Sequence, residues 1–167
     1  FVRTSKTTAE LGRDTAEAVA AAKGLPGQVA TLILPADVSW GEGGIASAPI
    51  PPVTPMCADD LTVDNIAQLI RSGSKVALLL GGRALREPSL IAAGRIATHC
   101  GVKLFADVFP TRLERGAGIP NVERIAYLAE LVNVQLADYE HLILVDSKAP
   151  VSFFAYPGRK SYLVPDG

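Results

Sequence analysis

Lys75-Val-Ala-Leu-Leu-Leu-Gly-Gly-Arg83 places this chain among the α/β proteins. An uninterrupted apolar run that ends in paired glycines is typical of a buried parallel strand followed by a phosphate-facing turn. Two further segments accompany it, Gln28-Val-Ala-Thr-Leu-Ile-Leu-Pro-Ala-Asp-Val-Ser-Trp40 upstream and Leu142-Ile-Leu-Val-Asp-Ser-Lys-Ala-Pro-Val-Ser-Phe-Phe154 downstream. Together the three segments indicate a nucleotide-type α/β domain within a piece of a larger protein.

Helices and strands are predicted to alternate on both sides of this run. The spacing of apolar residues predicts helices at 62–72, 88–100 and 122–136, the last with Asn121 as its N-cap. Short apolar runs predict strands at 75–80, 103–108 and 141–145, with 161–164 as a candidate fourth strand. Strands that alternate with helices imply a parallel sheet with right-handed crossovers.

The first 45 residues predict a smaller αβ unit. A helix is expected over 7–23, capped by Thr7 or Thr8 and ended by Gly24, followed by a strand at 29–34. The proline-rich segment 49–55 favours an extended linker. Because the sheet partners of this one strand are missing from the sequence, we expect dimerisation through it or a loosely attached segment, with 58–167 as the protease-resistant unit.

Composition excludes several classes of partner. Sixteen basic and 17 acidic residues give a net charge of -1, which does not favour nucleic acid or an anionic membrane. No apolar run approaches the roughly 20 residues of a membrane helix, and no signal peptide opens the chain, so we expect a cytoplasmic protein. Cys57 and Cys100 lack metal-site spacing, so neither zinc nor a disulfide framework is expected. The first residue, Phe1, and the closing turn signal Val164-Pro-Asp-Gly167 suggest a piece of a longer chain.

Ligands of parallel sheets bind beyond the carboxyl ends of the strands. The candidate positions are the turns that follow the three predicted strands: Gly81, Gly82 and Arg83; Asp107 to Arg112; and Asp146, Ser147 and Lys148. Glycines let the backbone approach a pyrophosphate, and Arg or Lys neutralises its charge. The alternative is that the glycines only form the turn and the charged side chains are solvated.

Other segments give weaker signals. Gly116-Ala-Gly118-Ile-Pro-Asn121 begins like a dinucleotide-binding motif but lacks its last glycine and does not directly follow a strand. His99 and His141 have no partner at catalytic or ligand spacing, and both are interpreted as structural. The aromatic run 151–157 could shape a pocket or dock another domain, but such residues most often fill a core, and Trp40 is interpreted as an anchor at a domain edge. No catalytic or metal-ligating residue is predicted.

Three stretches resemble the thiamine-diphosphate-dependent enzymes. Ala30-Thr-Leu-Ile-Leu-Pro-Ala-Asp37 resembles the closing strand of their pyrimidine-binding domain, and Val76 to Arg83, after the linker, resembles the start of their central domain. Phe109-Pro-Thr-Arg-Leu-Glu-Arg115 with Lys148-Ala-Pro-Val-Ser-Phe-Phe-Ala-Tyr-Pro157 is similar to the acetolactate synthase large-subunit-like branch, which also contains benzoylformate-decarboxylase-like proteins.

The resemblance implies a domain division and the place of the cofactors. Residues 1–45 would be the end of the pyrimidine-binding domain, 46–57 a linker, and 58–167 a Rossmann-like central domain truncated at its C-terminal end. In the family, the catalytic glutamate lies early in the pyrimidine-binding domain and the Gly-Asp-Gly magnesium and diphosphate motif lies in the third domain, so the resemblance places neither in this chain. Thiamine diphosphate and Mg²⁺ are therefore expected outside this chain, which would itself be inactive.

The resemblance also implies a parent enzyme that acts on 2-oxo acids by decarboxylation and carboligation, as in branched-chain amino acid biosynthesis. The alternatives are a 2-keto-acid decarboxylase and, in another class, a non-catalytic nucleotide-binding or interaction module. Some relatives bind FAD or ADP in the central domain, so Gly81, Gly82, Arg83, Ser147 and Lys148 are the predicted nucleotide contacts. Expected partners are the remaining domains of the parent chain and further copies in a homo-oligomer, with no nucleic acid and no membrane.

Overall fold

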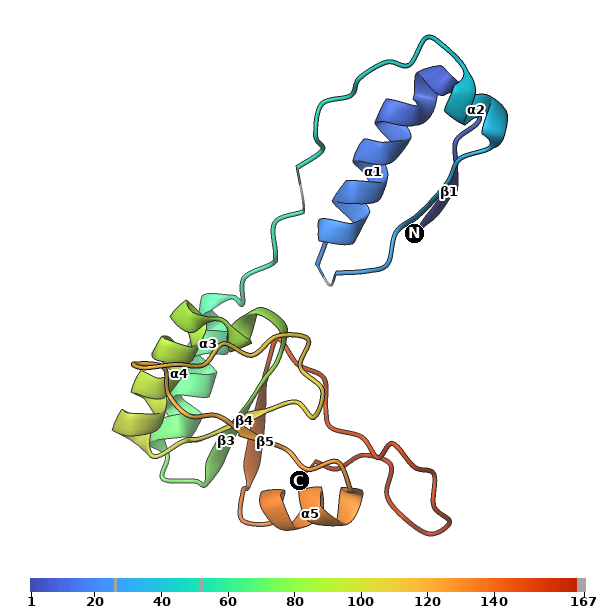
Figure 1. Ribbon diagram of the computed structural model, residues 1–167. Helices are drawn as coiled ribbons and strands as arrows, with labels where there is room; N and C mark the ends of the chain where they lie inside the picture. Colours follow the sequence, from blue (N-terminus) through green and yellow to red (C-terminus); the bar gives the residue numbers. More distant parts are fainter. Residues whose placement is uncertain (26, 52, 165–167) are drawn as a thin grey trace. The chain divides into compact units, whose positions relative to one another are not determined.

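The computed structural model describes residues 1–25, 27–51 and 53–164, and the chain forms two compact units, Phe1–Cys57 and Ala58–Gly167 (Figure 1). Pro26, Pro52 within the predicted linker, and the turn signal at 165–167 lie outside the described residues. No helix in the described part of the chain has the length and apolarity needed to cross a membrane.

The first unit packs one helix on a two-stranded parallel sheet. Its elements are β1 (Val2–Thr4), η1 (Thr8–Glu10), α1 (Leu11–Lys23), β2 (Thr31–Ile33) and α2 (Ala36–Trp40). The Thr7 hydroxyl accepts the Glu10 N–H at 3.3 Å and so caps η1, while α1 itself begins only at Leu11 without a side-chain cap. The chain leaves α1 at Gly24 as expected.

The expectation that the strand of the first unit lacks a partner is wrong. Residues Val2–Thr4 form β1, which pairs in parallel with Thr31–Ile33. The buried carboxylate of Asp14 on α1 accepts the Ser5 hydroxyl at 2.9 Å and an Arg3 guanidinium N–H at 2.9 Å. These two hydrogen bonds hold β1 in place. With only three residues, β1 is too short to produce an alternating pattern in the sequence.

The second unit confirms the predicted α/β class. Its elements are α3 (Asp60–Arg71), β3 (Val76–Leu80), η2 (Gly82–Leu85), α4 (Glu87–Cys100), β4 (Lys103–Ala106), β5 (Glu123–Arg124), α5 (Ala129–Leu136) and β6 (His141–Val145). All four strands are parallel, in the order β5-β4-β3-β6. In chain order this is third, second, first, fourth, the arrangement of a Rossmann-type sheet, and β6 forms one edge.

Helices cover both faces of this sheet (Figure 1). Val76, Leu78 and Leu80 of β3 pack with residues of α3 and α4, whereas Ala77 and Leu79 belong to a second core with Val132 and Leu136 of α5. Every residue of β3 is buried. This explains why its sequence is uniformly apolar rather than alternating.

Only the second half of the helix predicted for 122–136 is helical, and two residues of its first half form the strand β5. Glu123 and Arg124 pair with Phe105 and Ala106, so Asn121 caps no helix, and α5 begins only at Ala129. The Gln135 side chain holds the intervening segment by accepting the Ala126 N–H at 2.7 Å. Ile125 is buried in the same core as Val132 and Leu136 of α5. A strand followed by a helix therefore buries the same apolar residues whose spacing predicted one continuous helix.

Three smaller boundaries also differ from the predictions. The strand β4 ends at Ala106 rather than at residue 108, and 161–164 contributes only an antiparallel bridge between Val151 and Tyr162. Helix α3 is capped by Asp59, whose carboxylate accepts the Thr62 N–H and hydroxyl, both at 2.8 Å. The backbone hydrogen bond from Thr62, followed by the hydroxyl bond, lowers the pKa of Asp59.

An ion pair links β4 to β5. Lys103 Nζ lies 2.7 Å from Glu123 Oε2, and the hydrogen bond from Lys103, followed by that from Gln135, lowers the pKa of Glu123 below its ordinary value of 4.5. A carboxylate with a lowered pKa stabilises the fold above its unfolded pKa, and this contribution is lost as the pH falls through the folded value.

We therefore expect Glu123→Gln to destabilise the protein at pH 7 by no more than about 1 kcal/mol, because both side chains are nearly half exposed. The difference from wild type should shrink between pH 7 and about pH 2, as the pH falls through the lowered pKa of Glu123 and the carboxylate is protonated. Urea denaturation at the two pH values measures it, with Asp64→Asn on the exposed surface of α3 as the control. A difference that persists at low pH would contradict this assignment.

Candidate functional site

The order of strands reverses between β3 and β6, which makes their carboxyl ends the switch point of the sheet. The turns that follow them are Gly81–Arg83 and Asp146–Lys148, so the fold brings together the two predicted groups of site residues. Gly81 N–H donates to Val145 O at 3.0 Å, and a Cβ on Gly81 would lie 2.5 Å from the Asp146 carbonyl oxygen. The two turns therefore touch backbone to backbone.

Asp146 occupies the centre of this junction. Its φ of 50° is in the left-handed region, which Asp tolerates better than most residues. Its Oδ2 accepts the Arg83 N–H at 2.7 Å. The amide that opens η2 is therefore already bonded to a carboxylate of the chain.

Ser147 connects the switch point to the end of β4. Its hydroxyl lies 3.3 Å from Asp107 Oδ2 and also 3.3 Å from the Lys148 carbonyl oxygen. Asp107 N–H in turn donates to Leu80 O at 3.4 Å. The three predicted turns thus form one continuous surface at the carboxyl edge, with the exposed side chains of Arg83 and Lys148 as its cations.

The start of α4 lies beside this edge and is also capped by a carboxylate. Glu114, in the loop between β4 and β5, accepts the Glu87 N–H on Oε2 at 2.6 Å, while its Oε1 pairs with Arg112 at 2.8 Å. Sequence reasoning missed this contact because the two residues are 27 positions apart and no local pattern connects them.

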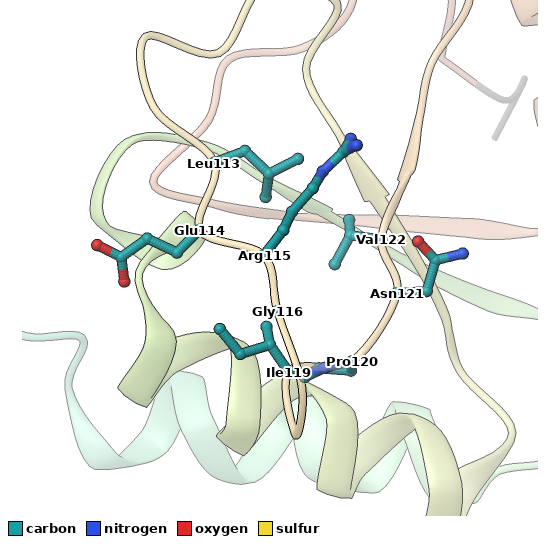
Figure 2. A pocket seen from close by; sticks show the side chains of 8 residues that line it. All are labelled: Leu113, Glu114, Arg115, Gly116, Ile119, Pro120, Asn121 and Val122. Atoms are coloured by element: carbon teal, nitrogen blue, oxygen red, sulfur yellow. The ribbon is translucent and has the colours of Figure 1, made fainter.

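The loop from β4 to β5 encloses a hollow of about 160 Å³ (Figure 2). Leu113, Val122 and the stem of Arg115 face the space between the two arms of the loop, whereas Glu114 points away from it. The glycines of the weak motif, Gly116 and Gly118, lie in this loop and have positive φ angles. They do not precede a helix, so the geometry of a dinucleotide-binding turn is absent from this loop.

Five aromatic side chains form a cluster, and three of them belong to the run 151–157 that sequence reasoning assigned to a core. Neighbouring ring centroids are 5.4 to 5.9 Å apart, and each residue is 39% to 67% exposed. The aromatic cluster consists of Phe109, Tyr127, Phe153, Phe154 and Tyr156. The expectation that the aromatic residues of 151–157 fill a core is therefore wrong, and the contributions of Phe109 and Tyr127 carried no sequence signal. Trp40, interpreted as an anchor at a domain edge, is 86% exposed.

The described residues contain no group of three His, Cys, Asp or Glu side chains arranged to hold a metal ion. The edge offers the exposed side chains of Arg83 and Lys148, the carboxylates of Asp107 and Asp146, and the Ser147 hydroxyl. This set can bind polar groups, and its hydroxyl donates to the Asp107 carboxylate at 3.3 Å. The role of Gly81, Gly82, Arg83, Ser147 and Lys148 as nucleotide contacts stays a prediction.

Comparison with known proteins gives a clear result. Over all 167 residues the chain is 48% identical to a Mycobacterium tuberculosis protein named "Putative acetolactate synthase large subunit IlvX" and covers 32% of it. A solved structure, "X-ray structure of a putative thiamin diphosphate-dependent enzyme isolated from Mycobacterium smegmatis", matches 99% of the chain with a TM-score of 0.70 at 20% identity, which supports the fold. No protein-family model matches the chain.

The chain spans about a third of the length of both proteins, 32% of the first and 31% of the second. The first of these alignments extends from Phe1 to Gly167 and so includes both units and the segment that joins them. The chain is therefore similar along its whole length to a protein named as an acetolactate synthase large subunit, and it spans about a third of that protein.

Proposed function

We propose that this chain is the architectural middle segment of an enzyme that decarboxylates a 2-oxo acid and joins the product to a second carbonyl compound, as an acetolactate synthase does. The observation that carries the proposal is the 48% identity along the entire chain to a protein of that name. The parent enzyme would act in branched-chain amino acid biosynthesis, in the cytoplasm, as a homo-oligomer.

The residues of the chain do not fit thiamine diphosphate or its magnesium ion. The sequence contains no Gly-Asp-Gly triplet, and the described residues hold no carboxylate cluster suited to Mg²⁺. We therefore assign both groups to other parts of the parent enzyme and derive no reaction step within this chain. Its contribution would be a scaffold that keeps the catalytic domains in place.

The 167-residue protein alone is expected to have no activity. With thiamine diphosphate, Mg²⁺ and pyruvate, neither acetolactate nor acetaldehyde should form above the level of a heat-treated control, because we assign the groups that activate the cofactor to other parts of the parent enzyme. Product analysis measures both compounds in one assay. Turnover by the purified protein would contradict the assignment of an architectural role.

A chimera tests the parent reaction. Residues 1–167 would replace the matching third of the Mycobacterium tuberculosis relative, and both proteins would be assayed with pyruvate. Acetolactate from both proteins supports the proposed synthase, whereas acetaldehyde alone supports the second candidate, a 2-oxo-acid decarboxylase. A folded relative and a folded chimera that both leave pyruvate unchanged would refute the proposed function.

A non-catalytic interaction module is the candidate from another class. It is favoured by the aromatic cluster, because exposed aromatic patches often mark sites of contact with another protein surface. This candidate also expects no turnover from the 167-residue protein, so only the chimera separates it from the enzyme segment.

A further inference from the structure

The paired glycines at the end of β3 leave space that Asp146, from the turn after β6, occupies. A Cβ on Gly81 would lie 2.5 Å from the backbone oxygen of Asp146, and a Cβ on Gly82 would lie 2.4 Å from its side-chain Oδ2. In nucleotide-binding sheets, glycines at this position allow a pyrophosphate to approach the backbone. Here the atoms that approach the two glycines belong to Asp146.

The carboxylate of Asp146 also uses the hydrogen-bond donor that a phosphate would need. The Arg83 N–H donates to Oδ2 at 2.7 Å, the distance of a charge-assisted hydrogen bond. The left-handed backbone of Asp146, with φ at 50°, lies directly against these glycines. The space beside the two glycines, the hydrogen bond and the backbone angle therefore all show that the Asp146 carboxylate occupies this turn.

The neighbouring helix start is occupied in the same way. Of the first N–H groups of α4, that of Glu87 donates to Glu114 Oε2 at 2.6 Å, and Pro88 has none. Arg112 pairs with the other carboxylate oxygen of Glu114. Two backbone sites that favour an anion at this edge are thus both bonded to carboxylates of the chain.

We infer that Asp146 and Glu114 supply, from within the chain, the negative charge that a nucleotide diphosphate would bring, so that this sheet edge does not bind FAD or ADP through its phosphates. A diphosphate at the Gly81–Arg83 turn would have to displace the Asp146 carboxylate or lie in contact with it. Two negatively charged groups in contact repel each other. The inference replaces the predicted phosphate contacts at Gly81, Gly82 and Arg83. It does not depend on the reaction of the parent enzyme.

Two substitutions of Asp146 separate the anion from the backbone conformation. Glycine and asparagine both tolerate the left-handed region, but only asparagine keeps an oxygen that can accept the Arg83 N–H. The melting temperatures of the wild-type chain, Asp146→Gly and Asp146→Asn are compared with no addition and with millimolar ADP, FAD or inorganic phosphate. Sodium chloride at the same ionic strength is the control for general salt effects.

The wild-type melting temperature should not respond to any of the three ligands. That of Asp146→Gly should fall by a few degrees, since the Arg83 amide loses its charged partner, and should rise again with phosphate. That of Asp146→Asn should fall less and show no response to phosphate.

Several outcomes would overturn the inference. They are a saturable rise of the wild-type melting temperature with ADP or FAD that Arg83→Ala weakens, an Asp146→Gly variant as stable as wild type, or no effect of phosphate on that variant. Where Asp146→Gly does not fold, the backbone amide resonance of Arg83 in the wild-type protein is followed during ADP titration. An unchanged resonance supports the inference, and a saturable shift refutes it.

Discussion

Replacing Phe105 with alanine is expected to lower the free energy of unfolding of the second unit by about 3 to 5 kcal/mol. Phe105 lies on β4, is 2% exposed, and meets the Tyr139 ring edge to face at 5.6 Å. It belongs to the core that α5 covers, together with Leu79 and Val132. Removing the ring leaves a cavity that strands paired on both sides cannot close.

Urea denaturation of the full chain, followed by circular dichroism, measures this loss. Phe109→Ala is the matched control, because this residue lies four positions further along the chain but is 67% exposed. Its substitution should cost about 1 kcal/mol or less. Equal losses for the two variants would show that the core of α5 and β4 is not packed as described.

Gly81→Ala is expected to cost about 1 to 3 kcal/mol, although it adds a single methyl group. The new Cβ would lie 2.5 Å from the Asp146 carbonyl oxygen and 3.0 Å from Ser147 Cβ. The first of these contacts is with backbone, so no side-chain rotation relieves it. The ends of β3 and β6 would have to separate, which weakens the bond from Gly81 N–H to Val145 O.

Gly44→Ala provides the comparison for this variant. A Cβ there would lie no closer than 3.8 Å to another atom, an ordinary van der Waals distance, and the backbone needs no positive φ. Its stability should equal or slightly exceed that of wild type. A Gly81→Ala protein as stable as Gly44→Ala would mean that the two turns do not touch.

The central part of the fold could be predicted because its signals are local and strong. The buried strand at 76–80 is apolar throughout, and α4 begins beside Pro88 and ends at Gly101, whose φ of 70° is the glycine stop expected from the sequence. The alternation of helices and strands then restricts the sheet to parallel pairing.

The errors arose where contacts between distant segments decided the structure. Residues 123 and 124 became a strand because β4 offered an edge, although the apolar spacing around them also suited a helix. β1 exists because β2 and Asp14 hold it. Neither partner can be recognised from the few residues of the strand itself.

The candidate site shows the same division. Its location followed from the sequence, since turns after parallel strands meet at one edge and the strand order places 81–83 beside 146–148. The hydrogen-bond partners of its polar groups could not be predicted from the sequence. A sequence records that Asp146 is acidic, but only the geometry shows that this carboxylate bonds to the Arg83 amide rather than facing a ligand.

The position of β6 has a practical consequence for handling the protein. This strand borders the four-stranded sheet and, within the described residues, pairs on one side only. Leu144 and Val145 are 41% and 36% exposed, and the strand carries neither the charge nor the proline with which natural edge strands discourage pairing. An open apolar edge of this kind promotes self-association as protein concentration rises. Leu144→Lys should therefore raise the protein concentration at which the chain begins to self-associate. Light scattering over a dilution series would measure this concentration for both proteins.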